Sequence, residues 1–407
     1  MANTLQLGNG KWATGKDTVL SFSDTNNNFK PLPFNFSRAS SATVVNQSGL
    51  IETVGSGTPR IDFLGNTKGA LLLEPSRTNV FTNSNAIQSM GFGFVGASIQ
   101  ADVTTSPDGT TNADLLKENT ANGNHFMFKD FNLSSGQTYT ISVFAKKNGV
   151  NRNLRFGDGG VGWSSGFNVS FDLTNGTADS GGVIESYGNG WYRCSVKGTT
   201  SATTSRLIVY NATNQTSYQG DGSSGVFFYG FQIEQGSYAT SYIPTSGSAV
   251  TRVADACSQT VPDGVIGQTE GTVYWEINVE TTVATSNENI LNVDNGSGFG
   301  HTIYFIKSAT GAILGEMYVS GVLQATFIKS NITKGVHKMA MGYANNNTSF
   351  FVDGVQVGVT DTSCTVPLMS RIQLGNGVFG QMDCLSNDVK LYNTRLSNAE
   401  LASLTTI

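Results

Sequence analysis

Two carboxylates at alternating positions are the most enzyme-like feature of this 407-residue chain. Glu276 and Glu280 flank Asn278, and all three fall on the face opposite the apolar residues of a strand-like segment. Two such carboxylates could serve as nucleophile and general acid in glycoside hydrolysis. The alternative is a solvated outer face of a sheet. We favour this alternative, because no aromatic-rich cleft pattern surrounds the three positions.

Other catalytic arrangements lack the residues they need. The three histidines, His125, His301 and His337, show no metal-ligand spacing, and no serine elbow or Cys/His pair is recognisable. The glycine-rich stretch 157–162 lacks the lysine and the helix that follow a phosphate-binding loop. The sequence therefore predicts a protein that is not an enzyme.

Sugar binding needs an aromatic platform for the pyranose ring and planar polar side chains for its hydroxyls. Trp163 and Tyr187 lie among glycine and serine residues, which leaves their rings free to be exposed. His125 opens a predicted strand and could point into a cleft. Each has a structural alternative: a loop anchor tucked into the core for Trp163, and a satisfied edge histidine for His125. Trp191 is better explained as core.

The elements that must position these residues are strands. With 48 glycines and only 13% charged residues, the composition disfavours helices, while 24 Phe and 13 Tyr supply bulky residues for β-sheet cores. A net charge of −5 gives no basic footprint, so we expect no nucleic-acid partner. The N-terminal residues are polar and no apolar run approaches about 18 residues, so we expect neither a signal peptide nor membrane insertion.

The four cysteines have no CxxC spacing. Cys194 lies in a strand-like stretch and is predicted to be a small buried apolar residue. Cys364 and Cys384 could pair, which the sequence leaves open. Free thiols fit synthesis in a cytoplasm.

Period-2 patterns place strands in two regions. The first region contains six of them: 125–131, 139–146, 167–173, 191–196, 206–210 and 226–234. There, Asn175-Gly176 predicts a hairpin turn with two positive φ angles. In the second region Val273, Trp275, Ile277 and Val279 alternate along one strand, and Asp353-Gly354 predicts another hairpin turn. Ser397 and Glu400 form a capping box that opens a short terminal helix.

Several motifs resemble those of known proteins. The stretches 36–43, 49–53, 58–63 and 70–79 resemble, in order and spacing, the junction segment of bacteriophage and prophage tail-fibre or head-fibre proteins. Further stretches resemble phage-encoded domains of the carbohydrate-binding, galactose-binding jelly-roll type: 106–110, 135–146, 188–194, 220–225, and 230–234 followed by 239–245. The order of parts from 271 to 401 resembles a concanavalin A-like lectin or laminin-G sandwich.

The resemblance implies an all-β fold of tandem β-sandwiches after an extended N-terminal arm. The expected domains are an arm and junction at 1–78, a jelly roll at 79–245, a linker at 246–267 and a lectin-like sandwich at 268–407. Glucanases on the concanavalin-like fold carry Glu, Asp and Glu at alternating positions, and Asn278 departs from that pattern. Laminin-G-like domains often bind ligand or calcium at a loop like the one flanked by Asp294, Asn295 and His301. A flexible polar turn is the alternative there.

The implied function is non-catalytic adhesion of a phage particle to bacterial surface glycans, with localisation in the virion. Contact with other virion proteins through the N-terminal arm, a homotrimer and a structural Ca²⁺ are expected by analogy, with Glu234 as one possible ligand. Two alternatives stay open: a structural decoration protein of the capsid or tail without ligand, and a polysaccharide depolymerase using Glu276 and Glu280.

Overall fold

The computed structural model describes residues 3–24, 29–149, 151–279, 287–375, 380–381 and 384–407. They form two compact units that alternate along the chain. Unit 1 comprises residues 1–47, 53–76 and 253–407, and unit 2 comprises residues 48–52 and 77–252. Unit 2 is thus an insertion between two parts of unit 1. Within the described residues, no helix is long and apolar enough to cross a membrane.

Unit 1 is a β-sandwich built from both ends of the sequence. Its strands are β1 (Leu5–Gly8), β2 (Ala13–Gly15), β3 (Thr18–Asp24), β4 (Phe29–Ser37), β7 (Arg60–Asp62), β8 (Ala70–Leu73), β25 (Ala256–Thr260), β26 (Glu270–Val279), β27 (Glu288–Asp294), β28 (His301–Lys307), β29 (Ile313–Val319), β30 (Val322–Lys329), β31 (Gly335–Ala344), β32 (Thr348–Val352), β33 (Val355–Asp361), β34 (Arg371–Leu374), β35 (Gly380–Gln381) and β36 (Cys384–Tyr392). The short β5 (Ala42–Val45) and β6 (Ile51–Val54) lie between β4 and β7 in the chain.

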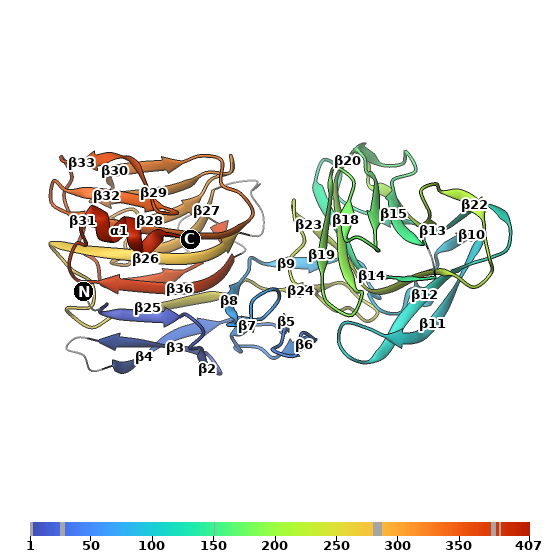
Figure 1. Ribbon diagram of the computed structural model, residues 1–407, viewed down its shortest axis with the longest axis horizontal. Coiled ribbons are helices and arrows are strands. Elements are labelled where there is room, and N and C mark those ends of the chain that lie inside the picture. The colour runs from blue at the N-terminus through green and yellow to red at the C-terminus, as the bar shows by residue number, and fades with distance from the viewer. Residues whose placement is uncertain (1–2, 25–28, 150, 280–286, 376–379, 382–383) are drawn as a thin grey trace. The chain divides into compact units, whose positions relative to one another are not determined.

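The N-terminal strands are integral to this sandwich, which differs from the predicted arm. β1 pairs with β36 and with β3. β3 also pairs with β4, which lies beside it in Figure 1, and β4 pairs with β25. The first strands therefore link β36 to β25, and Leu5, Leu7 and Phe34 are buried in the core. The predicted linker likewise contains strands, since β25 pairs with β34. A strand pattern shows which residues share a face, but partners as distant in sequence as Ser37 and Ala256, or Leu5 and Leu391, leave no local signal.

The strand from Glu270 to Val279 confirms the predicted alternation. Val273, Trp275, Ile277 and Val279 are all buried in the unit 1 core. Phe305 and Phe350, from β28 and β32, meet with ring centroids 5.3 Å apart, so strands of the two layers pack face to face. The fold is all-β, as predicted, and the Asp353-Gly354 turn joins β32 to β33 with both φ angles positive.

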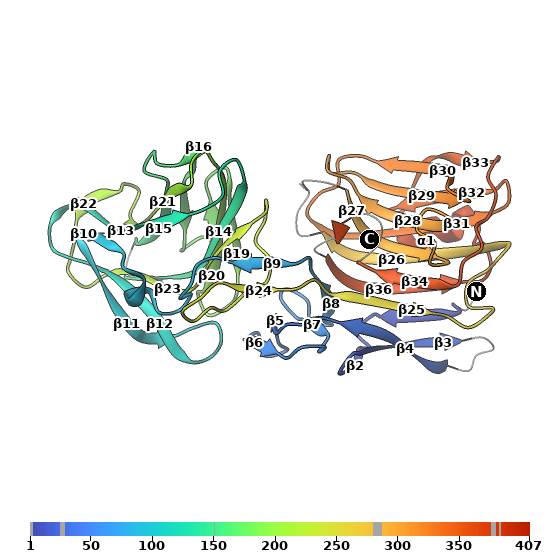
Figure 2. The same ribbon diagram turned by 180° about the vertical axis from the view of Figure 1, so that it is seen from behind.

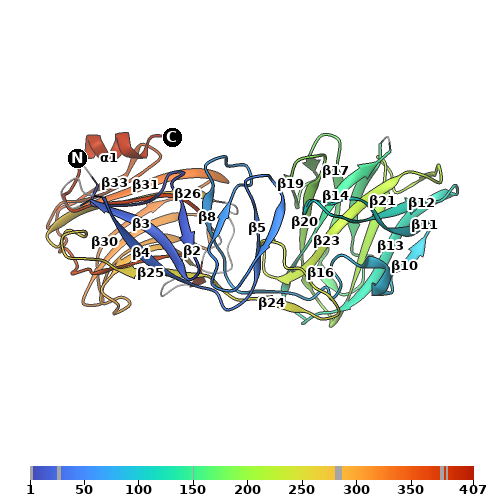
Figure 3. The ribbon, with the colours of Figure 1, turned by 90° about the horizontal axis from the view of Figure 1, so that it is seen from below.

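The terminal helix α1 (Asn398–Thr405) begins with the predicted capping box. The Ser397 side chain accepts a hydrogen bond from the Glu400 backbone, and the Glu400 carboxylate accepts one from the Ser397 backbone. Leu401 packs with Tyr274 and Phe351 in a small cluster on the outer side of β26 and β32. Figure 3 shows α1 beside β31 and β33.

Unit 2 is a jelly-roll-like sandwich of two seven-stranded sheets. The first sheet contains β10 (Gly93–Val95), β13 (Asn122–Asn132), β21 (Thr204–Ala212), β15 (Asn153–Gly157), β17 (Asn168–Asp172), β18 (Thr177–Ala178) and β22 (Ser217–Gln219). The second contains β11 (Ala97–Thr105), β12 (Thr111–Glu118), β23 (Gly225–Gln235), β14 (Thr138–Asn148), β20 (Tyr192–Thr200), β16 (Trp163–Ser165) and β19 (Gly182–Ser186). The ribbon of β9 (Arg77–Asn79) and β24 (Val250–Arg252) and the 3-10 helix η1 (Ile87–Met90) complete it.

Inward-facing residues of both sheets form the unit 2 core, including Met127, Val143, Val209 and Phe231. Trp191 and Cys194 are buried, as predicted. The hairpin at Asn175-Gly176 is present between β17 and β18, but only Gly176 has a positive φ, of 67°. The loop from 173 to 176 is longer than a two-residue turn, which removes the need for a second left-handed residue.

Candidate functional site

The outer face of the first sheet of unit 2 carries an open set of aromatic rings. On β13, Met127 faces the core, so its neighbours Phe126 and Phe128 point the other way, where they are only half-buried. On β21, Val209 faces the core and Tyr210 lies half-buried on the outside. Figure 2 shows β10, β13, β21 and β15 as neighbours in this sheet.

These rings form a continuous stripe. Phe126 is the cross-strand partner of Tyr210, and their ring centroids are 5.0 Å apart. Phe126 and Phe128 are separated by 6.1 Å between ring centroids. Separations of this size are typical of interacting aromatic pairs. Phe126, Phe128 and Tyr210, together with Arg155, are called the aromatic face below.

Two glycines make room for the rings. A Cβ added at Gly93 would lie 2.5 Å from Cε1 of Phe128, so the Phe128 ring occupies the place of a missing side chain. A Cβ at Gly157 would lie 3.1 Å from Cε2 of Tyr210 and 3.2 Å from Oδ1 of Asn168. Any larger residue at Gly157 would therefore press on the Tyr210 ring and on the exposed Asn168 amide.

A row of residues crosses four strands of this face. Phe126 on β13 is opposite Tyr210 on β21, Tyr210 is opposite Arg155 on β15, and Arg155 is opposite Ser170 on β17. Because neighbouring strands are about 4.8 Å apart, the row places two rings, a guanidinium and a hydroxyl side by side. The Arg155 Nη1 donates to Ser170 Oγ at 3.4 Å. Burial raises the pKa of Tyr210, and the charge of Asp158 raises it further while that of Arg155 lowers it.

An ion pair borders the stripe. Arg206 on β21 donates two hydrogen bonds to Asp130 on β13, with N–O distances of 2.7 and 2.9 Å. Its guanidinium also lies 5.3 Å from the centroid of the Phe128 ring. These hydrogen bonds lower the pKa of Asp130. The charge of Arg206 is thus already compensated within the protein.

Aromatic rings beside planar polar donors are the combination that sugar recognition requires. A ring can cover the apolar face of a pyranose, while amide, hydroxyl and guanidinium groups bond its hydroxyls. The sequence patterns did not single out this set. A signal was present, because the strand 125–131 carries bulky apolar residues on both of its faces. Which face is open could not be read from that pattern.

The structure places the predicted Trp163 as an anchor. It lies in β16, its Nε1 donates to the Arg206 carbonyl at 2.8 Å, and its ring meets Phe167 edge-on with centroids 5.0 Å apart. The indole is half-buried against the unit 2 core. This matches the alternative in which Trp163 holds a loop.

Tyr187 belongs to a ring group on the second sheet of unit 2. Its ring meets the fully buried Phe144 edge-on, with centroids 4.8 Å apart. Phe144 also packs on Tyr229 and Tyr242, at 5.8 and 6.0 Å. Tyr187 thus lies at the half-buried margin of a packed cluster and belongs to a different sheet from the aromatic face.

His125 is completely buried. Its Nδ1 is 2.7 Å from the Gly96 carbonyl oxygen and its Nε2 is 3.2 Å from the Tyr218 carbonyl oxygen. The ring also packs on Tyr218, with centroids 4.6 Å apart. His125 is thus a buried structural residue whose ring nitrogens face the backbone of Gly96 and of β22.

The structure brings Asp294, Asn295 and His301 together at the turn between β27 and β28. Arg371 donates to both carboxylate oxygens of Asp294, at 2.8 and 3.2 Å. The side-chain oxygen of Asn295 accepts the Ser297 backbone N–H at 3.1 Å, and His301 Nδ1 accepts that of Leu368 at 3.1 Å. Asn295 is engaged within the turn, whereas Asp294 and His301 bond to the segment around β34, so each of the three side chains has a partner inside the protein.

Of the two carboxylates considered for hydrolysis, Glu280 lies outside the described residues. Glu276 accepts hydrogen bonds from the Tyr274 hydroxyl at 3.2 Å and from the Asn387 amide at 3.3 Å. Asn278 follows on the same strand.

The predicted calcium ligand does not fit a metal site. Glu234 is buried, and it accepts hydrogen bonds from Gln232, from the Thr240 backbone and from the Thr240 hydroxyl at 2.6, 2.9 and 2.7 Å. Arg77 lies 3.8 Å away. Among the described residues, no group of three or more His, Cys, Asp and Glu side chains is placed to hold an ion. Cys364 is a buried free thiol, so the possible disulfide to Cys384 is not formed.

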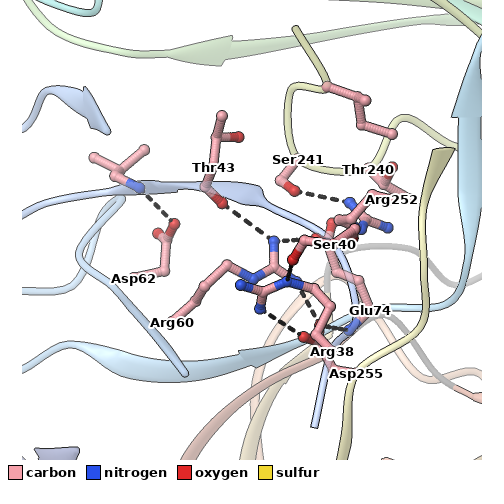
Figure 4. Close-up of polar contacts among 12 residues, drawn as sticks. Arg38, Ser40, Thr43, Arg60, Asp62, Glu74, Thr240, Ser241, Arg252 and Asp255 are labelled. Carbon is pink, nitrogen blue, oxygen red and sulfur yellow. Dashed lines mark hydrogen bonds and ion pairs between the residues drawn. The ribbon is translucent and has the colours of Figure 1, made fainter. Parts of the chain in front are cut away.

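The junction motif forms a buried ion network in unit 1 (Figure 4). Asp255 accepts hydrogen bonds from Arg38 at 3.0 Å and from Arg60 at 2.5 Å, and Arg60 also pairs with Glu74 at 2.5 Å. The Glu74 backbone N–H donates to Asp255 at 2.9 Å. The network joins Glu74, shortly before the insertion, to Asp255, just after it. Because these charges are fully buried, removing one partner would leave an uncompensated charge.

No protein-family model matches the sequence, and no curated protein sequence does. Among solved structures, the CBM40 domain of a Ruminococcus gnavus IT-sialidase covers 35% of this chain and 85% of its own, with 13% identity and a TM-score of 0.30. Domains LG4-5 of the mouse laminin α1 chain cover 77% of this chain and 94% of their own, with 11% identity and a TM-score of 0.25. A Trypanosoma rangeli sialidase covers 95% and 81%, with 12% identity and a TM-score of 0.28. At these identities and TM-scores the likeness carries no information about a ligand.

Proposed function

We propose that this chain is a non-catalytic glycan-binding protein and that the aromatic face of unit 2 is its sugar platform. The observation that carries the proposal is the row formed by Phe126, Tyr210 and Arg155, in which half-buried rings and a guanidinium lie side by side on the outer face of paired strands. Such a row offers both halves of sugar recognition, stacking area and directional hydrogen bonds. Residues on paired strands also keep a fixed geometry, which lowers the entropic cost of binding.

The test is a glycan-array screen of the full-length chain that reads both retention and product release. We expect saturable retention without cleavage, lost in Tyr210→Ala. Tyr318→Ala is the matched control, because Tyr318 is a half-buried ring in unit 1 that packs on Phe299 at 5.1 Å. Loss of binding in Tyr318→Ala alone would move the site to unit 1. Product release would favour the depolymerase alternative.

Trp163→Ala separates the two aromatic candidates within unit 2. Because its indole anchors a loop, we expect lower stability and unchanged affinity for a folded variant. Retained binding by Tyr210→Ala together with lost binding by a folded Trp163→Ala would contradict the aromatic face. Running the array with and without Ca²⁺ tests whether a bound ion takes part.

We further propose that the chain acts on a phage particle, as a fibre or spike protein that attaches the virion to bacterial surface glycans. This placement rests on the motif resemblance of residues 36–79 and 106–245. Several copies, a trimer by analogy, would multiply a weak single-site affinity. Immunogold labelling of particles released by the source strain tests it. Particles without label would favour a glycan-binding protein that acts elsewhere.

The N-terminal segment is a less suitable virion anchor than the resemblance implies, because β1, β3 and β4 are strands of unit 1. We therefore propose that other surfaces of unit 1 make any contact with virion proteins. A structural decoration role without ligand is the remaining alternative, and an array without any binding would favour it.

A further inference from the structure

Of the two arginines beside the rings of the aromatic face, Arg206 has a carboxylate partner and Arg155 has none among the described residues. This difference suggests the class of sugar that the face binds. The inference rests on the glycan-binding function proposed above. Arg206 and Arg155 both lie on the outer side of the same sheet. Arg206 is neutralised by the bidentate contact with Asp130. Within the described residues, Arg155 has no carboxylate within 4.0 Å, and its recorded hydrogen bond is the 3.4 Å contact with Ser170 Oγ.

Arg193 and Arg395 likewise lack a carboxylate within 4.0 Å among the described residues, but Arg193 is buried and Arg395 donates four hydrogen bonds, so Arg155 differs from both in its exposure and its few contacts. Arginines with a carboxylate partner within 4.0 Å are Arg38, Arg60, Arg77, Arg152, Arg206 and Arg371. A guanidinium has five N–H donors in a planar fork that matches a carboxylate. Most N–H donors of Arg155 make no hydrogen bond within the described structure, and the side chain lies half-buried opposite Tyr210 on the neighbouring strand.

Two acidic residues, one three positions after Arg155 and one that contacts its strand partner Ser170, already accept backbone hydrogen bonds. Asp158 follows β15, and its Oδ1 accepts the Gly160 backbone N–H at 2.8 Å. Asp179 accepts the Ser170 backbone N–H at 3.1 Å. Both hold loop backbone, so they do not replace a missing partner for Arg155.

We propose that the aromatic face binds a carboxylate-bearing glycan, with the carboxylate on Arg155 and a ring of the same glycan on Tyr210 and Phe126. The strand register places these groups in one row at intervals of about 4.8 Å. Ser170 lies on the far side of Arg155 and adds a hydroxyl to the same end. Charge-assisted, bidentate contacts of this kind are short and directional, so they discriminate an acidic sugar from its neutral counterpart.

The experiment compares matched pairs of probes on the full-length protein by calorimetry. Oligogalacturonate and its methyl ester differ only in the charge of the carboxyl group, while a sialylated oligosaccharide and its asialo form separate a sialic acid from a uronic acid. We expect the acidic member of at least one pair to bind about tenfold more tightly, which is about 1.4 kcal/mol. Arg155→Gln should abolish this preference while keeping the weaker neutral affinity.

Two variants make the outcomes distinct. Lys197→Gln removes one positive charge from an exposed position on β20 in the other sheet, and it should keep the acid preference. Tyr210→Ala should weaken acidic and neutral probes alike. The acidic-sugar inference would be overturned if the unchanged protein bound the acidic and neutral probes equally well. It would also be overturned if Lys197→Gln lost as much of the acid preference as Arg155→Gln. Neither result would contradict sugar binding by the aromatic face. Binding to sulfated probes alone would also overturn the inference. No binding to any glycan would overturn the platform as well.

Discussion

The outer faces of the two sheets of unit 2 both carry aromatic rings beside an arginine, but the rings are buried on one face and half-buried on the other. On the second sheet, Phe144, Tyr229 and Tyr242 form a ring cluster that is at most 4% exposed, and Arg193 lies 5.4 Å from the Phe144 centroid. On the first sheet, Phe126, Phe128 and Tyr210 form a similar group, and Arg206 lies 5.3 Å from the Phe128 centroid. The rings on the first sheet, Phe126, Phe128 and Tyr210, remain half-buried at the surface.

The difference lies in what covers the rings. Tyr242, from the segment after β23, packs on Phe144 and Tyr229, and its hydroxyl donates to Asn85 at 2.7 Å. The Tyr229 hydroxyl donates to Asp108 at 3.0 Å. In the described structure no such partner is recorded for the Tyr210 hydroxyl. Rings with covered faces and satisfied hydroxyls contribute to stability, whereas rings with an open face and a spare hydroxyl are suited to a ligand.

The largest loss of stability should come from deleting the buried N-terminal strands of unit 1. Deleting residues 1–37 removes the buried side chains of Leu5, Leu7, Val19 and Phe34, each worth about 1.5–3 kcal/mol of burial. Their sum is comparable with the whole stability of a domain. We expect unit 1 to lose hydrogen-exchange protection along β26 and β36 while unit 2 keeps its own.

Native protection in both units of this deletion variant would contradict the structural role of β1, β3 and β4. It would restore the separate arm that the sequence motifs suggested.

A matched pair of ring truncations tests the two faces directly. Phe144→Ala should destabilise unit 2 by about 3–5 kcal/mol, because a fully buried ring leaves a cavity. Phe126→Ala should cost about 1 kcal/mol or less, since its ring is already half-exposed. Hydrogen exchange of the unit 2 core strands under increasing urea gives both values. Equal costs would mean that the aromatic face is packed as tightly as the covered one.

The smallest effect is electrostatic and compares two aspartates of unit 2. Asp130 lies in the exposed ion pair, whereas Asp114 is buried, and burial raises the pKa of Asp114 to about 6. Because the folded value exceeds the unfolded one, the stabilising contribution is complete below about pH 4 and is lost as the pH rises through about 6. Asp114→Asn should therefore stabilise unit 2 by about 3 kcal/mol at pH 8 relative to the unchanged protein.

The same comparison at pH 4 is the control, where the two proteins should unfold at nearly the same urea concentration. Asp130→Asn should show no such gain at pH 8, because that carboxylate is stabilised by Arg206. A constant difference between Asp114→Asn and the unchanged protein from pH 4 to pH 8 would mean that Asp114 is not the titrating group.

Local features of this chain followed from its sequence. The alternation of Val273, Trp275, Ile277 and Val279 depends on the two-residue period of a strand, which any apolar core imposes. The capping box of Ser397 and Glu400 and the turn at Asp353-Gly354 depend on residues within three or four positions of one another. These interactions join residues that are neighbours in the chain, so they do not depend on the tertiary fold and can be predicted from the sequence.

Tertiary structure alone decided which segments belong together and which rings stay open. Arg38, Arg60 and Glu74 lie in motifs seen in the sequence, yet their convergence on Asp255 required contacts of Arg38 and Arg60 across 217 and 195 residues. Likewise, both sheets of unit 2 carry outward rings. Tyr242 and its neighbours cover the outer face of the second sheet. No such segment covers the described part of the first sheet at Phe126, Tyr210 and Arg155, so these residues stay half-buried at the surface. A two-residue period distinguishes the two sides of a strand, but it holds no information about what will later cover each side.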